Sequence, residues 1–582
     1  MSREANRRGE PVTAELGWII ALVAIVALGG ISVALWLGAL VNPEVQRLGT
    51  TNPLTIAQAF ASGRIRPTGG QVALTAAMFA AAAAFLGLLV VAWRRHTRTR
   101  TRVDYKSRHM AQPRDLARFY EPAARQDAAR LGATAAGTGV TLGADPRNGR
   151  NLYASYEWVQ IWLMGPRAGK TSCVCVPQIL ESNGPVLTTS NKRDIVDMTR
   201  GPRSDRGVVW VHDVQGIIGE ASAWWWNPLS FVVDMETAEK LTAVFQSAAE
   251  SANASQDAYF NSAGRETLAR LFLAAALDKR PITDVFRWAN NPDEKVDDPA
   301  AILIRHGQLA QGQALGETQG LTSKQRDGVY GTLRPWIGLL GNPKVLPWIT
   351  DAGNGRPHFD PYRFVTSTDT LYLISAEGGG SARAITAALT MAVLEAAERV
   401  GSLQPGGRLQ TPLLGVLDEA ANVCRWRELP DKYSHYGSRG IVLSTFFQSW
   451  QQGVEAFGET GMGKLWSAAN VRVVGSGLSE DKYLSFVSQA IGDFDTVKRS
   501  RSAQYRGTSI TTSIQRERIF DVADLTALPG GRAVMVATQT PAALVKLVHV
   551  SERPYAAAVK TSQTYYEQRA ARRAQPAQEA RR

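Results

Sequence analysis

The first hundred residues contain two long stretches without a charged side chain. Leu16 to Val41 and Gln71 to Trp93 are both predominantly apolar. A helix over the first stretch would rise roughly 39 Å at ~1.5 Å per residue, more than the ~30 Å hydrocarbon core of a bilayer. We therefore predict a transmembrane hairpin over residues 16–93, with spans 16–41 and 71–93. The alternatives are a signal peptide for the first stretch and a buried alanine-rich helix for the second.

The charges around this hairpin predict its orientation. Seven Lys or Arg residues and one Asp lie between Arg94 and Arg108, and such clusters mark the cytoplasmic side of a membrane span. Two crossings would then place the N-terminal residues 1–15 and the C-terminus both in the cytoplasm. The short external loop, 42–70, is expected to be too small for a core of its own. The predicted localisation is the cell inner (cytoplasmic) membrane, multi-pass, with membrane lipids as partners of the basic cluster.

Beyond a basic juxtamembrane linker, 94–150, the pattern changes to short apolar strands separated by helical stretches. Such alternation predicts a mostly parallel sheet with helices on both faces, an α/β fold. The predicted strands lie in "SYEWVQIWLM", "GPVLTTS", "GVVWVHD", "TLYLIS", "PLLGVLDE", "GIVLSTFFQS" and "VRVVGSG".

The same pattern divides the cytoplasmic part into segments. Residues 151–255 and 347–555 are expected to form one nucleotide-binding domain. Between them, apolar positions at helical spacing predict an all-α insertion domain over 256–346. Residues 556–582 form a basic polar tail, either disordered or partly helical.

Composition excludes several classes of protein. A chain of 582 residues with 45% apolar and 20% charged residues is neither disordered nor too short for several cores. Three cysteines without a CxxC spacing indicate no disulfide framework and no zinc site. The net charge of +13 is concentrated at 94–108 (+6) and 556–582 (+4), so the nearly neutral body gives no general indication of DNA binding.

The segment "WLMGPRAGKTSC", residues 162–173, resembles a phosphate-binding loop between a strand and a helix. Backbone N–H groups at a helix N-terminus can cradle phosphate oxygens, Lys170 can reach the β- and γ-phosphates, and Thr171 can ligate Mg²⁺. The cofactors would be ATP and Mg²⁺. The predicted nucleotide-binding residues are Gly165, Pro166, Arg167, Ala168, Gly169, Lys170, Thr171 and Ser172.

Met164 stands where the GxxxxGK[ST] motif has its first glycine. If that position needs a left-handed backbone, methionine there costs on the order of 1–3 kcal/mol of strain and weakens the site. Alternatively, Gly165 makes the turn and the loop closes one residue tighter.

The segment "PLLGVLDEAAN" supplies the second half of such a site. It is an apolar strand, a candidate neighbour of the phosphate-loop strand, that ends in Asp418 and Glu419. Asp418 can hold Mg²⁺ together with Thr171, and Glu419 can orient the attacking water. The alternative is a core strand that ends in two solvated acids.

Two further segments are distinctive. The stretch "DTVKRSRSAQYRGTSITTSIQRER" combines basic residues with a ring that could stack on a base, although a solvated hairpin fits it equally well. Its DNA-contact candidates are Lys498, Arg499, Arg501, Tyr505 and Arg506. Trp224 to Trp226, before Asn-Pro, are expected to be a core or interface anchor rather than ligands.

In their order along the chain, these motifs resemble the TraG/TraD family, the coupling-protein ATPases of conjugation and type IV secretion. The resemblance covers Gly143 to about Pro554 and includes "SNKRDIVDMT", "DAYFNSAGRETL" and "SRGIVLSTFFQSWQQ". It implies a RecA-like P-loop NTPase with an inserted helical domain, assembled as a homo-hexamer. The implied partners are single-stranded DNA, a relaxase or relaxosome, and the proteins of the secretion channel.

The resemblance also implies residue roles. Asp418 and Glu419 would be the Walker B acids, and Gln448 would contact the γ-phosphate or the attacking water. Arg439 would reach the nucleotide of a neighbouring subunit, and Lys192 lies in a basic motif after the second strand. The implied catalytic residues are therefore Glu419, Gln448 and Arg439.

The function predicted is a membrane-anchored, ATP-driven coupling protein that recruits relaxase-bound DNA and passes it to a secretion or conjugation channel. One alternative is a non-hydrolysing docking receptor for the same cargo, which Met164 would favour. Another is an FtsK-like DNA translocase. That class generally has several spans and a C-terminal winged-helix module, whereas fewer than thirty residues follow Pro554 here.

Overall fold

The computed structural model describes residues 33, 35–98, 101–249, 258–293, 296–376, 380–423, 426, 428–504 and 507–579, in places by the backbone alone. The chain forms two compact units, which divide between Thr101 and Arg102. Each unit is described by itself.

In the smaller unit, two short helices precede a long one: α2 (Pro43–Arg47), α3 (Pro53–Ala61) and α4 (Gly69–Arg98). Both short helices begin with Asn-Pro, where the asparagine side chain accepts a backbone N–H of the first turn and proline occupies the first helical position. A small apolar cluster forms here, which corrects the expectation that residues 42–70 cannot have a core. It consists of Ala39, Val45, Ile56, Ala59 and Ile65.

The predicted membrane localisation is contradicted. Within the part of the chain that the structure describes, no helix offers an apolar stretch of the length and hydropathy that a membrane crossing requires. The first predicted span, 16–41, lies mostly outside the described residues. The second falls in α4, where side chains are described without a gap only over 69–82, fewer than the ~20 residues a crossing needs.

The larger unit is built on an eleven-stranded sheet in the order β2-β1-β13-β12-β9-β3-β8-β7-β4-β6-β5. Its strands are β1 (Val140–Ala144), β2 (Asn151–Ala154), β3 (Gln160–Leu163), β4 (Val186–Ser190), β5 (Val209–His212), β6 (Thr370–Ile374), β7 (Leu413–Leu417), β8 (Ile441–Phe447), β9 (Val471–Gly475), β12 (Arg532–Ala537) and β13 (Ala543–Lys546).

The seven strands from β9 to β5 in this order pair in parallel. The prediction of an α/β fold with a mostly parallel sheet is therefore confirmed. The remaining strands, β12, β13, β1 and β2, extend the sheet by antiparallel pairs. Of these four strands, β1 lies in the segment 94–150, which was assigned to a linker.

Both faces of the sheet are covered. In β3, Ile161 and Leu163 belong to one apolar core, whereas Trp162 belongs to a second core together with Met164, the residue after the strand. Successive side chains of a strand point to opposite faces, so a fully apolar strand requires two cores.

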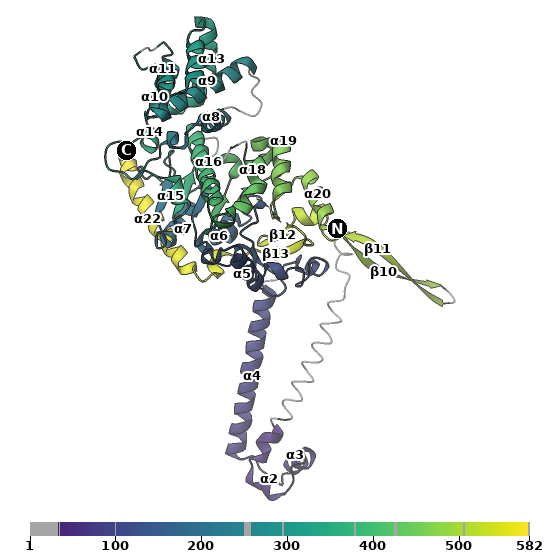
Figure 1. The fold of residues 1–582 in the computed structure, drawn as a ribbon. Coiled ribbons are helices and arrows are strands. Elements are labelled where there is room, and N and C mark those ends of the chain that lie inside the picture. Colours follow the sequence, from purple (N-terminus) through teal and green to yellow (C-terminus); the bar gives the residue numbers. More distant parts are fainter. Residues whose placement is uncertain are drawn as a thin grey trace. The chain divides into compact units, whose positions relative to one another are not determined.

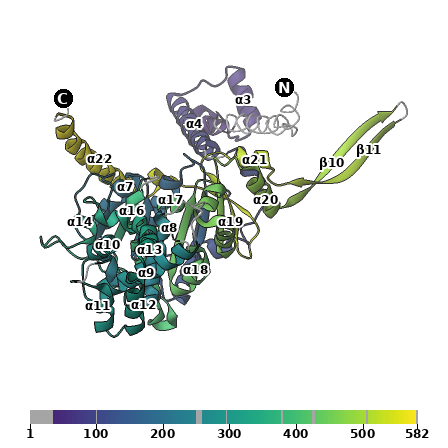
Figure 2. The same ribbon diagram turned by 90° about the horizontal axis from the view of Figure 1, so that it is seen from above.

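The helices of the larger unit pack on this sheet and on one another (Figures 1 and 2). They are α5 (Glu121–Arg130), α6 (Val176–Glu181), α7 (Asp194–Ser204), α8 (Met235–Ala249), α9 (Ala258–Leu277), α10 (Thr283–Asn290), α11 (Pro299–Arg305), α12 (Leu309–Gln319), α13 (Ser323–Ile337), α14 (Leu346–Ile349), α15 (Pro361–Phe364), α16 (Gly380–Ser402), α17 (Ala420–Val423), α18 (Leu429–Tyr436), α19 (Trp450–Ala468), α20 (Asp481–Ile491), α21 (Val522–Thr526) and α22 (Ala556–Glu579).

Between β5 and β6 the described chain is helical. Helix α9 packs against α8, α11 and α13, and these helices lie together in both views (Figures 1 and 2). The buried side of α9 includes Leu268, Leu271 and Phe272, which repeat at helical spacing along the sequence.

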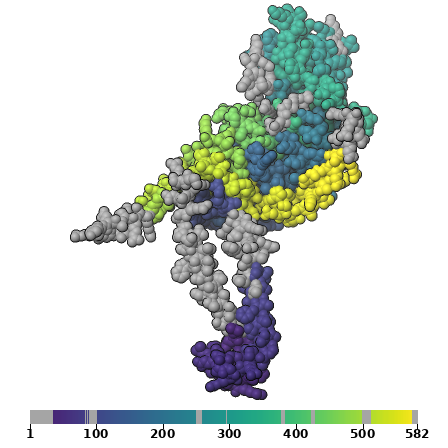
Figure 3. Space-filling view, turned by 180° about the vertical axis from the view of Figure 1, so that it is seen from behind, coloured from purple at the N-terminus to yellow at the C-terminus, as the bar shows by residue number. Residues whose placement is uncertain are grey.

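The C-terminal segment forms α22, which lies along the surface of the larger unit (yellow in Figure 3) and packs against α7. Ser562 Oγ donates to the carbonyl oxygen of Asp197 (2.6 Å) and accepts the backbone N–H of Gly201 (3.1 Å). The guanidinium of Arg200 stacks 3.4 Å from the centre of the Tyr566 ring. The described part of the basic tail is therefore a docked helix.

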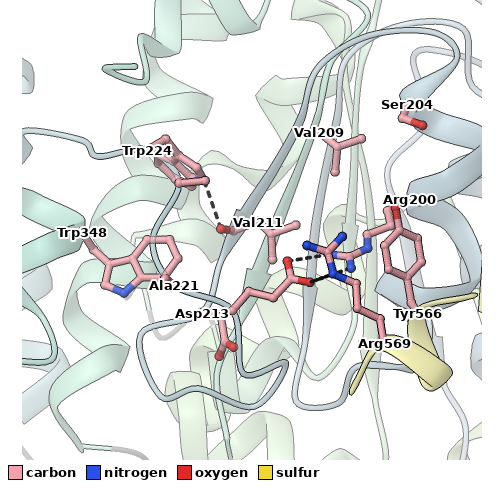
Figure 4. Close-up of a pocket in the computed structure, with 12 residues that line it drawn as sticks. Arg200, Ser204, Val209, Val211, Asp213, Ala221, Trp224, Trp348, Tyr566 and Arg569 are labelled. Carbon is pink, nitrogen blue, oxygen red and sulfur yellow. Dashed lines mark hydrogen bonds and ion pairs between the residues drawn. The ribbon is translucent and has the colours of Figure 1, made fainter. Parts of the chain in front are cut away.

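The tryptophans of "WWWNPLS" lie beside this contact. Trp224 and Trp226 are buried, and Trp224 Nε1 donates to the carbonyl oxygen of Val211 at 3.0 Å. Figure 4 shows Trp224 and Trp348 on one side of a pocket of ≈ 200 Å³, with Tyr566 and Arg569 on the other.

Candidate nucleotide site

The phosphate-loop residues connect β3 to a helix that starts with a π-helical turn, Thr171–Cys175, and continues as α6. Arg167 and Gly169 have positive φ, 59° and 85°. Left-handed residues within a turn direct successive backbone N–H groups into one concavity, which suits an anion. The loop therefore has the backbone shape that a phosphate group needs.

Met164 is buried and is not among the described non-glycine residues with positive φ. Its N–H donates to the carbonyl oxygen of Phe447 at 3.0 Å. Its side chain fills the space over Gly475, where an added Cβ would lie 2.6 Å from Met164 Cγ. The strain considered for this position is absent, and Met164 serves as a core residue below the loop.

Gly165 is the glycine that the loop requires. Its N–H donates to the carbonyl oxygen of Ser476 at 2.9 Å, and an added Cβ would lie only 2.0 Å from the carbonyl oxygen of Gly477. A side chain at 165 would push the phosphate loop away from the segment after β9. This close approach fits the alternative in which Gly165 makes the turn.

The two acids lie at the end of β7 and face the phosphate loop. Lys170 Nζ is 2.8 Å from Asp418 Oδ1 and 2.7 Å from Glu419 Oε1, and both acids are buried. Thr189 at the end of β4 donates its hydroxyl to the Asp418 carbonyl oxygen (2.7 Å). Strand β7 was expected to be a neighbour of β3, but β8 lies between them.

The charges of these three residues are strongly coupled. Burial raises the pKa of Asp418 to about 6, although Lys170 opposes this shift. Burial also opposes the charged form of Glu419, but Lys170 and hydrogen bonds from Gln448 and Gln452 outweigh it and lower the pKa. Burial would likewise discharge Lys170, yet the two carboxylates raise its pKa. Lys170 therefore remains an ammonium group.

Two glutamine side chains also hold Glu419. Gln448, which follows β8, donates its amide to Glu419 Oε1 at 2.7 Å. Gln452 in α19 donates to Glu419 Oε2 at 3.4 Å and accepts the backbone N–H of Gln448 at 2.9 Å. Glu419 itself has a positive φ of 55°, a backbone conformation that residues other than glycine rarely adopt. Sequence reasoning found Gln448 but missed Gln452.

The phosphate loop, the two acids and Gln448 line one cavity of ≈ 440 Å³, whereas Met164, Thr189 and Gln452 lie outside its lining. Its lining also includes three residues after β4. Of these, Lys192 was expected in a basic motif, whereas Asn191 and Asp194 were not named, although the segment "SNKRDIVD" contains them. The cavity residues are Gly165–Ser172, Asn191, Lys192, Asp194, Asp418, Glu419 and Gln448.

Arg439 lies away from this cavity. It precedes β8, whereas Gln448 follows β8, so the two residues are at opposite ends of one strand. Arg439 Nη1 donates to the carbonyl oxygen of Gly407 at 3.0 Å. An action on a neighbouring subunit stays a prediction.

The DNA-contact candidates lie in a hairpin formed by β10 (Asp493–Gln504) and β11 (Gly507–Arg518), which extends away from the sheet (Figures 1 and 2). Lys498 is half-exposed and pairs with Glu517 at 3.0 Å. Arg499 and Arg501 are described only by their backbone in β10, and Tyr505 and Arg506 lie outside the described residues. Their contact with DNA stays a prediction.

Comparison with protein families identifies one segment. Residues 412–530 match the family model described as "TraM recognition site of TraD and TraG". The matched segment runs from β7 with its acids, through Gln448 and Gln452, to the hairpin and α21. A comparison with curated protein sequences gives no match.

Comparison with solved structures shows the fold. The unbound monoclinic form of the bacterial conjugative coupling protein TrwBdeltaN70 matches with a TM-score of 0.51 at 15% identity, covering 72% of this chain and 91% of that one. The plasmid coupling protein TrwB, in complex with the non-hydrolysable GTP analogue GDPNP, matches with a TM-score of 0.51 at 16% identity, covering 72% and 92%. Together with the family model, this fold confirms the predicted resemblance to TraG/TraD proteins.

Proposed function

We propose that this chain, as a protein similar to the TraG/TraD coupling proteins, uses a nucleoside triphosphate to deliver DNA to a conjugation or secretion channel. The coupling-protein role rests on the family match over 412–530 and on the fold shared with TrwB, a conjugative coupling protein by its name. The proposal also includes hydrolysis of ATP by this chain.

One observation carries the nucleotide part. Lys170 of the phosphate loop lies within 2.8 Å of both acids after β7, in the same cavity as the loop. An ammonium group, backbone N–H donors and two carboxylates in one cavity are what a triphosphate with its metal ion requires. TrwB was solved with a GTP analogue in place, which supports a nucleotide here without selecting the base.

The residues fit a magnesium ion. Asp418 Oδ1 is buried and accepts no hydrogen bond from the residues that the structure describes, apart from its ion pair with Lys170. Thr171 lines the same cavity and supplies the hydroxyl that a P-loop offers to Mg²⁺. When bound, the ion would neutralise charge on the phosphate oxygens.

The remaining groups have distinct tasks in this proposal. Loop N–H groups and Lys170 hold the phosphates, which requires Lys170 to leave its ion pairs with the acids. Glu419 accepts a hydrogen bond from the attacking water and orients it. Gln448, which donates a hydrogen bond to Glu419, would contact the γ-phosphate or that water.

Glu419→Gln tests hydrolysis with little change in shape. We expect the variant to bind MgATP with an affinity within about threefold of wild type and to lose hydrolysis about 10²–10⁴-fold, the usual contribution of general-base catalysis. Glu459→Gln, an exposed acid on α19, is the matched control and should behave as wild type. A wild-type protein that binds but never hydrolyses MgATP would favour the docking-receptor alternative.

We further propose that the chain acts as a homo-hexamer in which Arg439 reaches a neighbour's nucleotide, and that segment 412–530 contacts a TraM-like relaxosome protein. The family description names TraM recognition, and single-stranded DNA is the proposed cargo. Arg439→Ala should lower hydrolysis in the assembled protein without affecting nucleotide binding. Equal turnover in the variant and wild type would remove Arg439 from the mechanism.

A further inference from the structure

Helix α19 begins beside the candidate nucleotide site, and its first turn has an unusual arrangement of hydrogen bonds. Ser449 is the N-cap, and its hydroxyl accepts the backbone N–H of Gln452 at 3.1 Å. The sequence Ser449-Trp450-Gln451-Gln452 is a capping-box pattern, in which the glutamine normally turns back to the N-cap backbone N–H. A purely structural role for Gln452 would be this cap.

The side chain of Gln452 instead bridges two residues of the site. Its Oε1 accepts the N–H of Gln448, one residue before the cap, and its Nε2 donates to Glu419 Oε2. Gln448 donates to the other oxygen of the same carboxylate. The carboxylate of Glu419 is therefore held at both oxygens by two glutamines that are themselves linked.

The start of α19 is fixed independently. Glu480, which follows β9, accepts the N–H groups of Trp450 and Gln451 at 2.7 and 2.8 Å. A carboxylate at a helix N-terminus is favourable, so the first turn of α19 has a cap that does not involve Gln452. The backbone of this turn is therefore held in place independently of the Gln452 side chain, which contacts Glu419 from it.

We propose that Gln452 is a positioning residue that keeps the Glu419 carboxylate aimed for catalysis. This inference rests on the proposed hydrolysis. In the structure Lys170 also holds Glu419, but Lys170 is needed by the phosphates once a nucleotide binds. Gln448 and Gln452 then remain as the partners of Glu419. Because Glu419 occupies a strained left-handed backbone position, it depends on such partners to stay in place.

Gln452→Glu separates the two roles. Glutamate keeps the acceptor for the Gln448 N–H and is as good as glutamine in a capping box, but it cannot donate to Glu419 and repels it. We expect the repulsion to lower the melting temperature, but at temperatures where the variant is folded we expect a KM for MgATP within about twofold of wild type and a kcat lowered about 10- to 100-fold, as for a lost hydrogen bond to a charged group. A kcat within twofold of wild type would overturn the inference.

Two further variants keep the test decisive. Gln451→Glu, at the exposed neighbouring glutamine, is the matched control and should leave kcat unchanged. If Gln452→Glu folds poorly, Gln452→Leu replaces it. Combined with Glu419→Gln, either substitution should cause no further loss of kcat, because Gln452 acts through Glu419. Additive losses would show a separate structural role and overturn the inference.

Failure of the proposed function is distinguishable from failure of this inference. If wild type does not hydrolyse MgATP, the proposed hydrolysis fails, and crystal structures of wild type and Gln452→Glu then decide the inference. A Glu419 carboxylate displaced from Gln448 in the variant supports it. An unmoved carboxylate overturns it.

Discussion

Met164 shows at the scale of one residue why a departure from a motif has to be judged by packing. Its side chain is buried against Gly475 and its backbone is not left-handed. Met164→Gly should therefore lower the free energy of unfolding by about 2–5 kcal/mol, as for other truncations of buried methionine, without tightening nucleotide binding. Chemical denaturation and a fluorescent-nucleotide titration measure the two quantities.

The matched control is Met164→Leu, which conserves volume and should lose less than about 1.5 kcal/mol. Nucleotide affinity that rises in Met164→Gly would show that the methionine strains the loop after all.

Gly165 leads to the opposite expectation. An added Cβ would overlap the carbonyl oxygen of Gly477, so Gly165→Ala should displace the loop and weaken nucleotide binding about 10- to 100-fold, the effect of a misplacement of about 1 Å. Isothermal titration calorimetry measures the affinity. Gly331→Ala, where a Cβ meets open space in α13, should have no effect, and equal affinities in all three proteins would disprove the requirement for glycine.

His212 at the end of β5 gives a pH dependence of stability. It is buried against Trp224 and Trp348, neither ring nitrogen has a hydrogen-bond partner in the described part of the chain, and burial lowers its pKa from 6.5 to about 3. Between these values the unfolded chain binds the proton and the folded chain does not. Stability is therefore full above pH 6.5 and is lost as pH falls, by about 2 kcal/mol at pH 5.

We expect this acid-induced loss to shrink by about 2 kcal/mol between pH 7 and pH 5 in His212→Leu. Urea denaturation at the two pH values measures it. His435→Leu, an exposed histidine in α18, should keep the wild-type loss. If both variants lose stability as wild type does, His212 titrates normally in the folded protein.

The residues that a motif specifies were found from the sequence, and those defined by a contact were not. Lys170, Asp418 and Glu419 stand in short segments with recognisable spacing, and the structure brings them together. Gln452 stands in a capping-box spacing, but that spacing does not predict its contact with Glu419, because the contact depends on the approach of α19 to the end of β7. The effect of Met164 likewise depends on Gly475, which is more than 300 residues away.

At the scale of elements, the parallel strands were predicted more reliably than their order. An apolar run identifies a strand that is buried on both faces, and β3, β4, β7 and β8 each lie in a predicted run. Which strands become neighbours depends on crossover connections through helices, so the position of β8 between β3 and β7 was missed. The short strand β1 lacks a long apolar run and was assigned to the linker.

Helix α22 has a contact surface that can be tested as one element. Arg200 stacks on Tyr566 and pairs with Glu220, which also pairs with Arg573. Tyr566→Ala should weaken the docking of α22 by about 0.5–2 kcal/mol through loss of the cation–π contact. Hydrogen exchange over residues 556–579 should then speed up about 2- to 30-fold, because opening becomes easier.

Tyr565→Ala is the control for this element, since the Tyr565 ring is exposed and meets the Tyr566 ring edge-on (4.8 Å between ring centres), whereas Arg200 stacks on Tyr566. It should exchange like wild type. Slow exchange that persists in Tyr566→Ala would show that the remaining contacts, among them those of Ser562 and the Glu220–Arg573 pair, are sufficient to hold α22.

For the whole molecule, the family resemblance came from the order of motifs over several hundred residues. The parallel sheet was predicted from the alternation of apolar strands and helical stretches over the same part of the chain. The membrane localisation came from two apolar stretches and the basic residues that follow the second, and the structure contradicts it within the described residues. A long apolar run carries less information than an ordered series of motifs, since several structures can satisfy it.

The whole larger unit should become more stable when a nucleotide binds, because a ligand specific to the folded state adds about 2.7 kcal/mol at 100 times its Kd. The nucleotide-free protein is stabilised by a different interaction of the same residue, because Lys170 neutralises two buried acids. Lys170→Met should therefore lower the melting temperature even without nucleotide, since an unpaired buried charge costs about 3–5 kcal/mol. Adding Asp418→Asn and Glu419→Gln to Lys170→Met should restore most of that loss.

Thermal melts of these three proteins with and without MgATP separate the two effects. Wild type should gain stability with MgATP, whereas neither variant should gain any, and only the single variant should melt early without it. If Lys170→Met melts like wild type in the absence of nucleotide, the ion pairs with Asp418 and Glu419 do not stabilise the free protein. If it also gains stability from MgATP as wild type does, the phosphates are not held by Lys170, and the nucleotide site has to be sought elsewhere in the chain.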